Sequence, residues 1–168
     1  MTAIGPVEPR TLIGVIGGQA ANEDAARLAY EVGREIGARD LLLVCGGRDG
    51  VMREACRGAK DAGGLTLAIL PGDDLSDANE FIDIPIVTGL GFARNTIIAR
   101  TCNALIAVHG SYGTLSEIAF ALIAGTPVVA LGSWTLADGS GGVPPIERAT
   151  TPAEAVARAV ALARPHNR

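Results

Sequence analysis

The chain contains few aromatic, histidine and cysteine residues. Aromatic residues make up only 4% of its 168 residues, and there are two histidines and three cysteines. The histidines, His109 and His166, and the cysteines lack the spacing of a zinc site, so we expect no metal held by side chains. The odd number of scattered cysteines (Cys45, Cys56 and Cys102) argues against a disulfide framework and favours a reducing cytoplasm.

The chain also lacks the usual features of nucleic-acid-binding, membrane and secreted proteins. Its formal net charge is −4, so it has no basic footprint for a nucleic acid polymer. No apolar run reaches the ~18 residues that a membrane-spanning helix needs. The first ten residues contain Pro6 and Pro9 but no apolar segment, so we expect no signal peptide. A small phosphorylated ligand stays compatible with this charge, because helix N-termini and one or two arginines can bind it locally.

Small aliphatic residues and glycine are abundant instead. The chain is 48% hydrophobic and has 22 glycines, a composition that suits a buried parallel sheet covered by closely packed helices. Apolar runs alternate with helix-like segments along its whole length. We therefore predict an α/β fold, a Rossmann-like doubly wound parallel sheet with helices on both faces. We expect one domain over residues 1–168, with residues 1–10 and 164–168 frayed.

The alternating pattern predicts six strands and five helices. The predicted strands are Thr11–Gly17, Leu41–Val44, Leu65–Leu70, Ile84–Val87, Ala104–Val108 and Pro127–Leu131. The predicted helices are Glu23–Ala38, Asp49–Ala62, Phe92–Cys102, Thr114–Ala124 and Thr151–Ala163. We expect Asn22 and Asp49 to cap the first two helices. The glycine-rich segment Gly132–Pro145 reads as a mobile loop.

Three glycine turns follow predicted strands. The carboxyl ends of parallel strands meet at one edge of a sheet, so these turns would present backbone N–H donors around a shared crevice. A single glycine turn is commonly needed only to reverse the chain, but three at one edge favour a ligand site. The first turn lacks a complete GxGxxG pattern, so we predict no dinucleotide fingerprint. The glycines are Gly17 and Gly18, then Gly46, Gly47 and Gly50, then Gly110 and Gly113.

The stretch from His109 to Glu117 carries the strongest functional signal. It joins an apolar strand to a helix-like run, so free backbone N–H groups and the positive end of the helix dipole meet there. We expect His109, at the end of the strand, to be structural rather than a proton carrier. The turn predicts an anion site, most often for a phosphate, formed by Gly110, Ser111, Tyr112, Gly113 and Thr114.

Glu117 has two possible roles. The spacing from Thr114 to Glu117 matches a capping box, in which the glutamate reaches back to the start of its own helix. The same spacing recurs from Thr151 to Glu154, where nothing nearby suggests chemistry. Spacing alone therefore favours a helix cap. The preceding glycines place this helix start at the expected ligand edge, which favours a catalytic role, and the two roles can coexist.

Arg94 begins a predicted helix, where a cation opposes the helix dipole. A residue placed against its local preference hints at function, and arginine suits bidentate contact with phosphate. We therefore expect Arg94, with the adjacent Asn95, to contact the ligand; the alternative is an ordinary surface arginine. Cys45 and Cys102 adjoin apolar segments, and we expect both to be buried rather than nucleophilic.

Three segments, in this order, resemble the LOG superfamily of Rossmann-like proteins, long misnamed possible lysine decarboxylases. They are Cys45–Met52, Arg94–Arg100 and Gly110–Glu117, and the resemblance covers roughly Thr11 to Leu131. The short length and the Arg94-Asn95 pair look more like the molybdenum cofactor carrier-like branch than the cytokinin-activating enzymes. Those enzymes have lysine where this chain has Asn95.

The resemblance implies two alternative functions. The carrier-like branch implies binding of the phosphate-bearing molybdenum cofactor without turnover, with Glu117 mainly a cap. The LOG enzymes imply a nucleoside 5′-monophosphate phosphoribohydrolase, with Glu117 as catalytic acid, Arg94 as its catalytic partner and the turn Gly110–Thr114 on the phosphate. Neither is a lysine decarboxylase. Our first expectation is a cytoplasmic binder of a phosphorylated nucleotide or pterin-type ligand, and the resemblance implies a homodimer or homotetramer.

Overall fold

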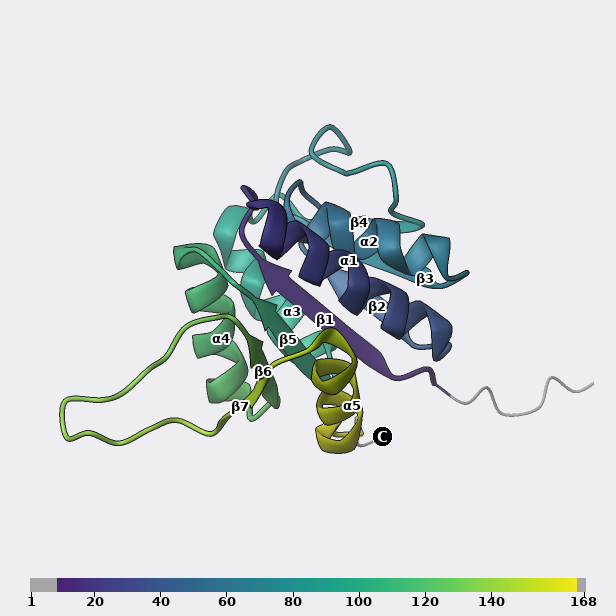
Figure 1. Ribbon diagram of the computed structural model, residues 1–168. Coiled ribbons are helices and arrows are strands. Elements are labelled where there is room, and N and C mark those ends of the chain that lie inside the picture. The colour runs from purple at the N-terminus through teal and green to yellow at the C-terminus, as the bar shows by residue number, and fades with distance from the viewer. Residues whose placement is uncertain (1–8, 166–168) are drawn as a thin grey trace, which may run out of the picture.

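The computed structural model describes residues 9–165, and it contains one sheet of seven parallel strands (Figure 1). The spatial order of the strands is β4-β3-β2-β1-β5-β6-β7. This arrangement confirms the predicted doubly wound Rossmann-like sheet. The strands are β1 (Leu12–Gly17), β2 (Leu42–Cys45), β3 (Leu65–Leu70), β4 (Ile84–Val87), β5 (Ala104–Val108), β6 (Val128–Leu131) and β7 (Ile146–Ala149).

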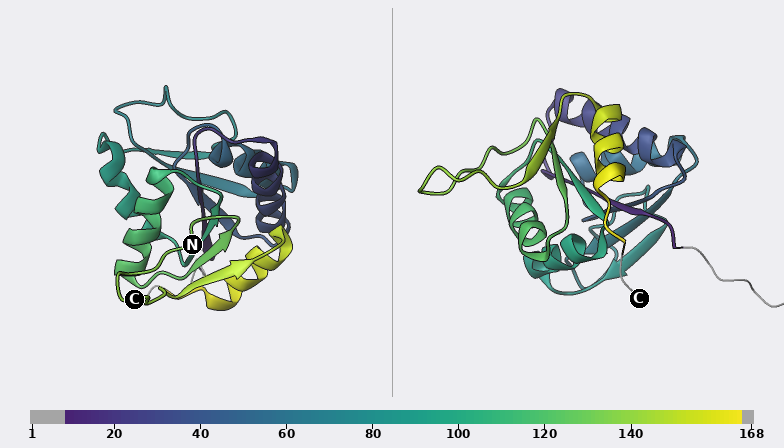
Figure 2. Two further views of the ribbon diagram at one scale, coloured as in Figure 1. Left: turned by 60° about the vertical axis from the view of Figure 1, so that its left-hand side comes forward. Right: turned by 90° about the horizontal axis from the view of Figure 1, so that it is seen from below.

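The helices cover both faces of the sheet (Figures 1 and 2). One apolar cluster joins the sheet to α1, α2 and α5, and a second joins its other face to α3 and α4. The inner strands read as apolar runs because both of their faces are covered. The helices are α1 (Glu23–Ala38), α2 (Val51–Asp61), α3 (Asn95–Thr101), α4 (Tyr112–Ala124) and α5 (Pro152–Leu162), with a short 3-10 helix η1 (Gly91–Arg94) before α3.

Three predicted helix starts are wrong by more than one residue, and two of the corrections concern glycine turns. Helix α3 begins at Asn95 rather than Phe92, because Gly91–Arg94 forms the separate 3-10 helix η1, so Arg94 is the N-cap of α3. Helix α2 begins at Val51 rather than Asp49, because Gly50 has a φ of 66° that the helix cannot contain. Asp49 therefore is not the cap of α2, whose N-cap is Gly50. Helix α4 begins at Tyr112, two residues earlier than predicted. The Asn22 cap is confirmed, since its side chain accepts a hydrogen bond from the Ala25 amide at 2.8 Å.

Strand β7 was missed by the sequence pattern. It is a four-residue edge strand in which only Ala149 is fully buried, and Glu147 and Arg148 are exposed. A strand this short and polar contains no apolar run, so the hydrophobic pattern of the sequence does not predict it. The segment Gly132–Pro145 before it contains no helix or strand and projects away from the sheet (Figure 1). Its mobility stays a prediction.

Both ends of the described chain make contacts with the rest of the domain. The Arg10 guanidinium lies 3.0 Å from the Asp40 carboxylate. The Arg164 amide donates to the Asn103 carbonyl at 3.0 Å, and the Asn103 side chain donates back to the Arg164 carbonyl at 2.6 Å. Fraying of these ends stays a prediction, and most of it falls on residues 1–8 and 166–168, outside the described chain. Within residues 9–165, no helix is both long and apolar enough to cross a membrane.

Candidate functional site

The three glycine turns lie at the same edge of the sheet. Strands β1, β2 and β5 are parallel neighbours, so the turns that follow them open onto one side. After β1 the chain continues to β2 on one side of β1, and after β5 it continues to β6 on the opposite side. The boundary between β1 and β5 is therefore the topological switch point of the sheet. The turns after β1 and β2 are in contact: the amide of Val51, the first residue of α2, donates to the carbonyl of Gly18 at 3.0 Å. The structure thus brings together the turns that the sequence predicted.

The turn after β5 has a strained backbone. His109 has a φ of 48° and Gly110 a φ of 141°, and a Cβ on Gly110 would lie 2.8 Å from the Thr114 side chain. The ring nitrogen Nε2 of His109 lies 3.2 Å from the Asp24 carboxylate, in the first turn of α1. His109 therefore ties the end of β5 to the start of α1, consistent with the structural role expected of it.

Helix α4 is not capped by Glu117. The N-cap is Ser111, and Thr114 takes the third helical position, with its hydroxyl accepting from the Ser111 amide at 3.2 Å. The predicted capping box from Thr114 to Glu117 is wrong, because the helix begins two residues earlier than the pattern suggested. The equivalent segment at α5 does form a cap: the Glu154 amide donates to Thr151 Oγ1 at 3.2 Å. The Thr-x-x-Glu spacing therefore marks a helix cap at α5 but not at α4.

Glu117 instead faces Arg94 in a buried pair. Their side chains are 7% and 8% exposed, and Arg94 Nη1 lies 3.4 Å from Glu117 Oε1. Burial raises the pKa of Glu117 to about 7, and the neighbouring Arg94 charge opposes the rise only in part. Burial also lowers the pKa of Arg94, although an arginine stays protonated. A carboxyl group with a pKa near 7 can donate or accept a proton at neutral pH.

Arg94 and Asn95 link three parts of this edge. The Arg94 guanidinium donates to the Asn95 side chain and, at 3.4 Å, to the carbonyl of Gly46 in the turn after β2. A Cβ on Gly46 would collide with that guanidinium. Asn95 is 1% exposed, and its Nδ2 donates to Ser116 Oγ at 2.8 Å. Within residues 9–165, the buried Nε of Arg94 has no hydrogen-bond partner.

A cavity of about 280 Å³ lies beside Arg94, and most of its lining was missed by the sequence analysis. The lining residues outside η1 come from loops that have no periodic pattern, and only Arg94 among all the lining residues was singled out as a site residue. The Arg48 Nε lies 3.7 Å from the Asp77 carboxylate across sequence-distant loops. The lining residues are Arg48, Pro71, Gly72, Asp77, Gly91, Phe92 and Arg94.

Tyr112 lies at the exposed start of α4. Its ring stacks on that of Trp134, with 6.1 Å between the ring centroids. The indole Nε1 of Trp134 donates to the Ser111 carbonyl at 3.2 Å. Trp134 thus braces the expected phosphate turn, a role that no sequence pattern indicated.

All three cysteines are buried, as predicted for Cys45 and Cys102. All three are free thiols, and Cys45 Sγ lies 3.5 Å from Cys56 Sγ. The contact with Cys45, together with burial, raises the pKa of the Cys56 thiol, and burial raises that of Cys102. Such thiols are inert. Among residues 9–165, no three histidine, cysteine or acidic residues gather in a group that could hold a metal ion.

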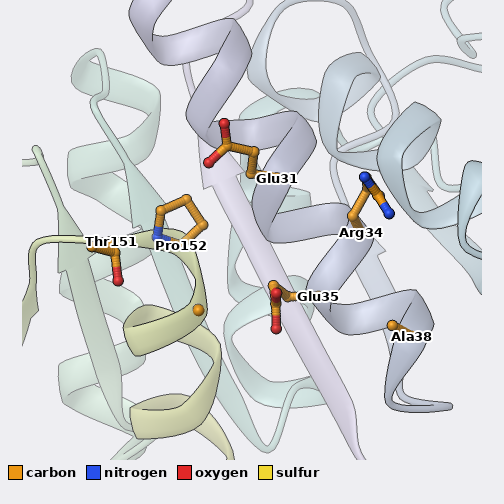
Figure 3. Close-up of a pocket in the computed structure, with 7 residues that line it drawn as sticks. Glu31, Arg34, Glu35, Ala38, Thr151 and Pro152 are labelled. Carbon is orange, nitrogen blue, oxygen red and sulfur yellow. The ribbon is translucent and has the colours of Figure 1, made fainter.

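A second cavity, of about 340 Å³, lies between α1 and the start of α5, and no glycine-turn residue lines it (Figure 3). Two acidic side chains at its wall are already paired within α1. Arg27 lies 3.1 Å from Glu31, and Arg39 lies 2.9 Å from Glu35. The two acidic side chains at this surface are therefore accounted for by neighbouring arginines along the chain.

The structure resembles solved molybdenum cofactor proteins. A molybdenum cofactor binding protein from Rippkaea orientalis is 33% identical, with a TM-score of 0.84, over 93% of this chain and 99% of that one. The molybdenum cofactor carrier protein from Chlamydomonas reinhardtii is 39% identical, with a TM-score of 0.80, over 91% of this chain and 98% of that one.

Sequence comparison leads to the same superfamily. A probable cytokinin riboside 5′-monophosphate phosphoribohydrolase from Oryza sativa is 30% identical over 100 residues, which are 54% of this chain and 41% of the rice protein. The model of the SLOG cluster4 family matches residues 10–161. The expected LOG resemblance is therefore confirmed, and the chain belongs to the SLOG cluster4 family.

Proposed function

We propose that this protein binds a phosphorylated nucleotide or pterin-type small molecule at the glycine-rich edge of its sheet, as a single domain in the cytoplasm. The observation that carries the proposal is the buried Arg94, whose Nε has no partner within residues 9–165 although it lies beside a cavity and the glycine turns. An unsatisfied buried donor is costly unless a ligand or water satisfies it. The free thiols of all three cysteines suit a reducing compartment.

In this proposal the phosphate lies against the turn Gly110–Thr114 at the start of α4, where backbone N–H groups and the helix dipole favour an anion. Arg94 adds a positive charge, and Asn95 holds Arg94 and α4 in place. The other glycines of the edge, namely Gly17, Gly18, Gly46, Gly47 and Gly50, let the backbone approach the ligand. The molybdenum cofactor is a ligand of this kind, and the two solved relatives support it as the cargo.

Thermal unfolding with added ligands tests this proposal. The probes are AMP, GMP, a pterin monophosphate and inorganic phosphate, followed by the molybdenum cofactor. A probe at 100 times its dissociation constant stabilises the fold by about 2.7 kcal/mol. Arg94→Met is expected to lose this stabilisation, and Arg39→Met, which removes an exposed charge from α1, is expected to retain it. If no probe raises the melting temperature, the proposal fails.

A second function, nucleoside 5′-monophosphate phosphoribohydrolase, is favoured by one observation. The buried Glu117, with its pKa raised to about 7, is able to transfer a proton, and Arg94 lies beside it. Incubation with AMP and N6-modified AMP, followed by detection of free base, tests this activity. Release of base that Glu117→Gln abolishes would establish the enzyme. Ligand binding without release of base would leave the carrier function.

We also propose that the chain forms a homodimer or homotetramer. Exposed apolar residues support self-association, among them Ile84 and Ile86 on the edge strand β4 and Ile123 on α4. Ile84 and Ile86 lie on an edge strand, whose unpaired backbone groups can pair with a second copy of the chain. Sedimentation equilibrium measures the mass directly, and a monomer at micromolar concentration would contradict this proposal.

A further inference from the structure

The cavity beside Arg94 contains a donor and an acceptor that the phosphate site does not use. Arg48 follows β2, Asp77 lies in the loop after β3, and both side chains line the cavity. The Arg48 Nε lies 3.7 Å from the Asp77 carboxylate, longer than a charge-assisted hydrogen bond. Both groups therefore retain hydrogen-bonding capacity for a ligand.

A buried side chain holds these two loops together. Asn79 is only 7% exposed, and its backbone amide donates to the Gly47 carbonyl at 2.8 Å. Its side-chain Nδ2 donates to the carbonyls of Gly47 and Arg48, both at 3.0 Å. Asn79 thereby fastens the loop of residues 73–83 to the turn after β2. The position of Asp77 opposite Arg48 is thus built into the fold.

The remaining walls suit a flat ring. The Gly91 amide donates to the Pro71 carbonyl at 2.9 Å, which fixes the η1 segment against the end of β3. Phe92, 78% exposed, lines the cavity and offers an aromatic face for stacking. A volume of about 280 Å³ is small for a ligand pocket, so the cavity suits one ring system with the rest of the ligand outside it.

We propose that this cavity selects heterocycles with a 2-amino-4-oxo pyrimidine edge, as in guanine and the pterins. The proposal rests on the proposed ligand-binding function. A carboxylate only accepts hydrogen bonds and a guanidinium only donates them. The ring carbonyl therefore accepts from Arg48, and the adjacent ring N–H and amino groups donate to the two oxygens of Asp77. Adenine presents a ring nitrogen that is an acceptor where Asp77 needs a donor, so its binding leaves polar groups unpaired.

Calorimetric titration with GMP, IMP, AMP and a pterin monophosphate tests the selection. We expect wild-type protein to bind GMP about tenfold or more tightly than AMP, because a bidentate contact discriminates by that order. IMP, which lacks the 2-amino group, is expected to lie between them. Asp77→Asn is expected to weaken binding of GMP and of the pterin about tenfold and to leave AMP within about twofold.

Glu80→Gln is the matched control. It removes the same charge from the same loop, but Glu80 pairs with Arg53 of α2 and does not line the cavity. It should leave the ratio of GMP to AMP affinity unchanged. Equal wild-type affinities for GMP and AMP, or an unchanged ratio in Asp77→Asn, would overturn the selection and leave the proposed function standing. Binding of none of the four probes would overturn the selection. It would overturn the proposed function as well only if the molybdenum cofactor also fails to raise the melting temperature.

Discussion

The guanidinium of Arg94 lies 3.4 Å from the carboxylate of Glu117, and both side chains are more than nine-tenths buried. The distance is long for a charge-assisted hydrogen bond. Burial raises the pKa of Glu117 to about 7, so its carboxyl group is only partly ionised at neutral pH. The charge of the site therefore changes within the physiological pH range.

This shift predicts that the wild-type free energy of unfolding falls as the pH rises from about 4.5 to about 7. In that range the folded protein binds the Glu117 proton and the unfolded chain releases it, so a rising pH favours unfolding. A shift from 4.5 to about 7 corresponds to about 3 kcal/mol. Glu117→Gln has no carboxyl group to titrate at this position. The difference in free energy of unfolding between the variant and wild type should therefore shift in favour of the variant by about 3 kcal/mol from pH 4.5 to pH 7. Urea unfolding at several pH values measures it, and a constant difference would contradict the prediction.

Glu154→Gln is a control with the opposite sign. Glu154 has the same Thr-x-x-Glu spacing, but the Thr150 amide and then the Arg158 guanidinium lower its pKa to about 2. Its ionised form stabilises the fold above pH 4.5, and this stabilisation is lost as the pH falls toward 2. Glu154→Gln should therefore be less stable than wild type at neutral pH, with the difference shrinking in acid. Matching pH profiles for the two variants would contradict the assignment of Glu117 as a buried group and Glu154 as a cap.

Replacing Arg94 should move the titration of Glu117 to higher pH. The Arg94 charge is the one that lowers the pKa of this carboxyl group, so Arg94→Met leaves burial unopposed and the pKa rises above about 7. Carbon-13 NMR of labelled glutamate side chains follows the carboxyl group directly. Arg39→Met, which removes an exposed arginine on α1, should leave the midpoint unchanged. An unshifted midpoint in Arg94→Met would show that the two side chains do not interact.

The sequence predicted six of the seven strands and the edge at which the glycine turns meet, because strands covered on both faces read as apolar runs. The helix-cap alternative that spacing favoured for Glu117 is wrong for a local reason. A helix start that moves by two residues turns Thr114 from an N-cap into the third helical position, and the apparent capping box disappears. Pattern matching cannot fix a helix boundary that closely.

The cavity could not be predicted for a different reason. Arg48, Asp77 and Asn79 come from two loops separated by about thirty positions, and no periodicity marks residues in loops. Asn79 stands among acidic residues of the sequence, namely Asp77 and Glu80, yet it is buried and donates to two carbonyls of the turn after β2. Contacts of this kind depend on which strands are neighbours in the sheet, and the sequence pattern does not give the order of the strands.

Asn79→Ala should release the loop of residues 73–83. The substitution removes the two hydrogen bonds to the carbonyls of Gly47 and Arg48, and a third in which Asn79 Oδ1 accepts from the Phe81 amide at 3.1 Å. We expect a loss of about 1–3 kcal/mol in the free energy of unfolding. Amide hydrogen exchange should also become faster in that loop than in wild type. Ser76→Ala, in the same loop but exposed, is the control. Unchanged exchange in Asn79→Ala would mean that other contacts hold the loop.

Gly33→Ala should destabilise the protein although alanine favours helices. Helices α1 and α2 pack with their backbones in close approach: a Cβ on Gly33 would collide with the Ala55 carbonyl, and one on Gly58 with the Tyr30 carbonyl. The helices can admit a methyl group only by separating, so we expect a loss of about 2–3 kcal/mol in the free energy of unfolding. Gly139→Ala, which would meet no atom within 4 Å, should be nearly neutral. Urea unfolding of both variants compares them. A Gly33→Ala protein as stable as wild type would show that the helices can separate at little cost, since helix propensity alone favours alanine by about 1 kcal/mol.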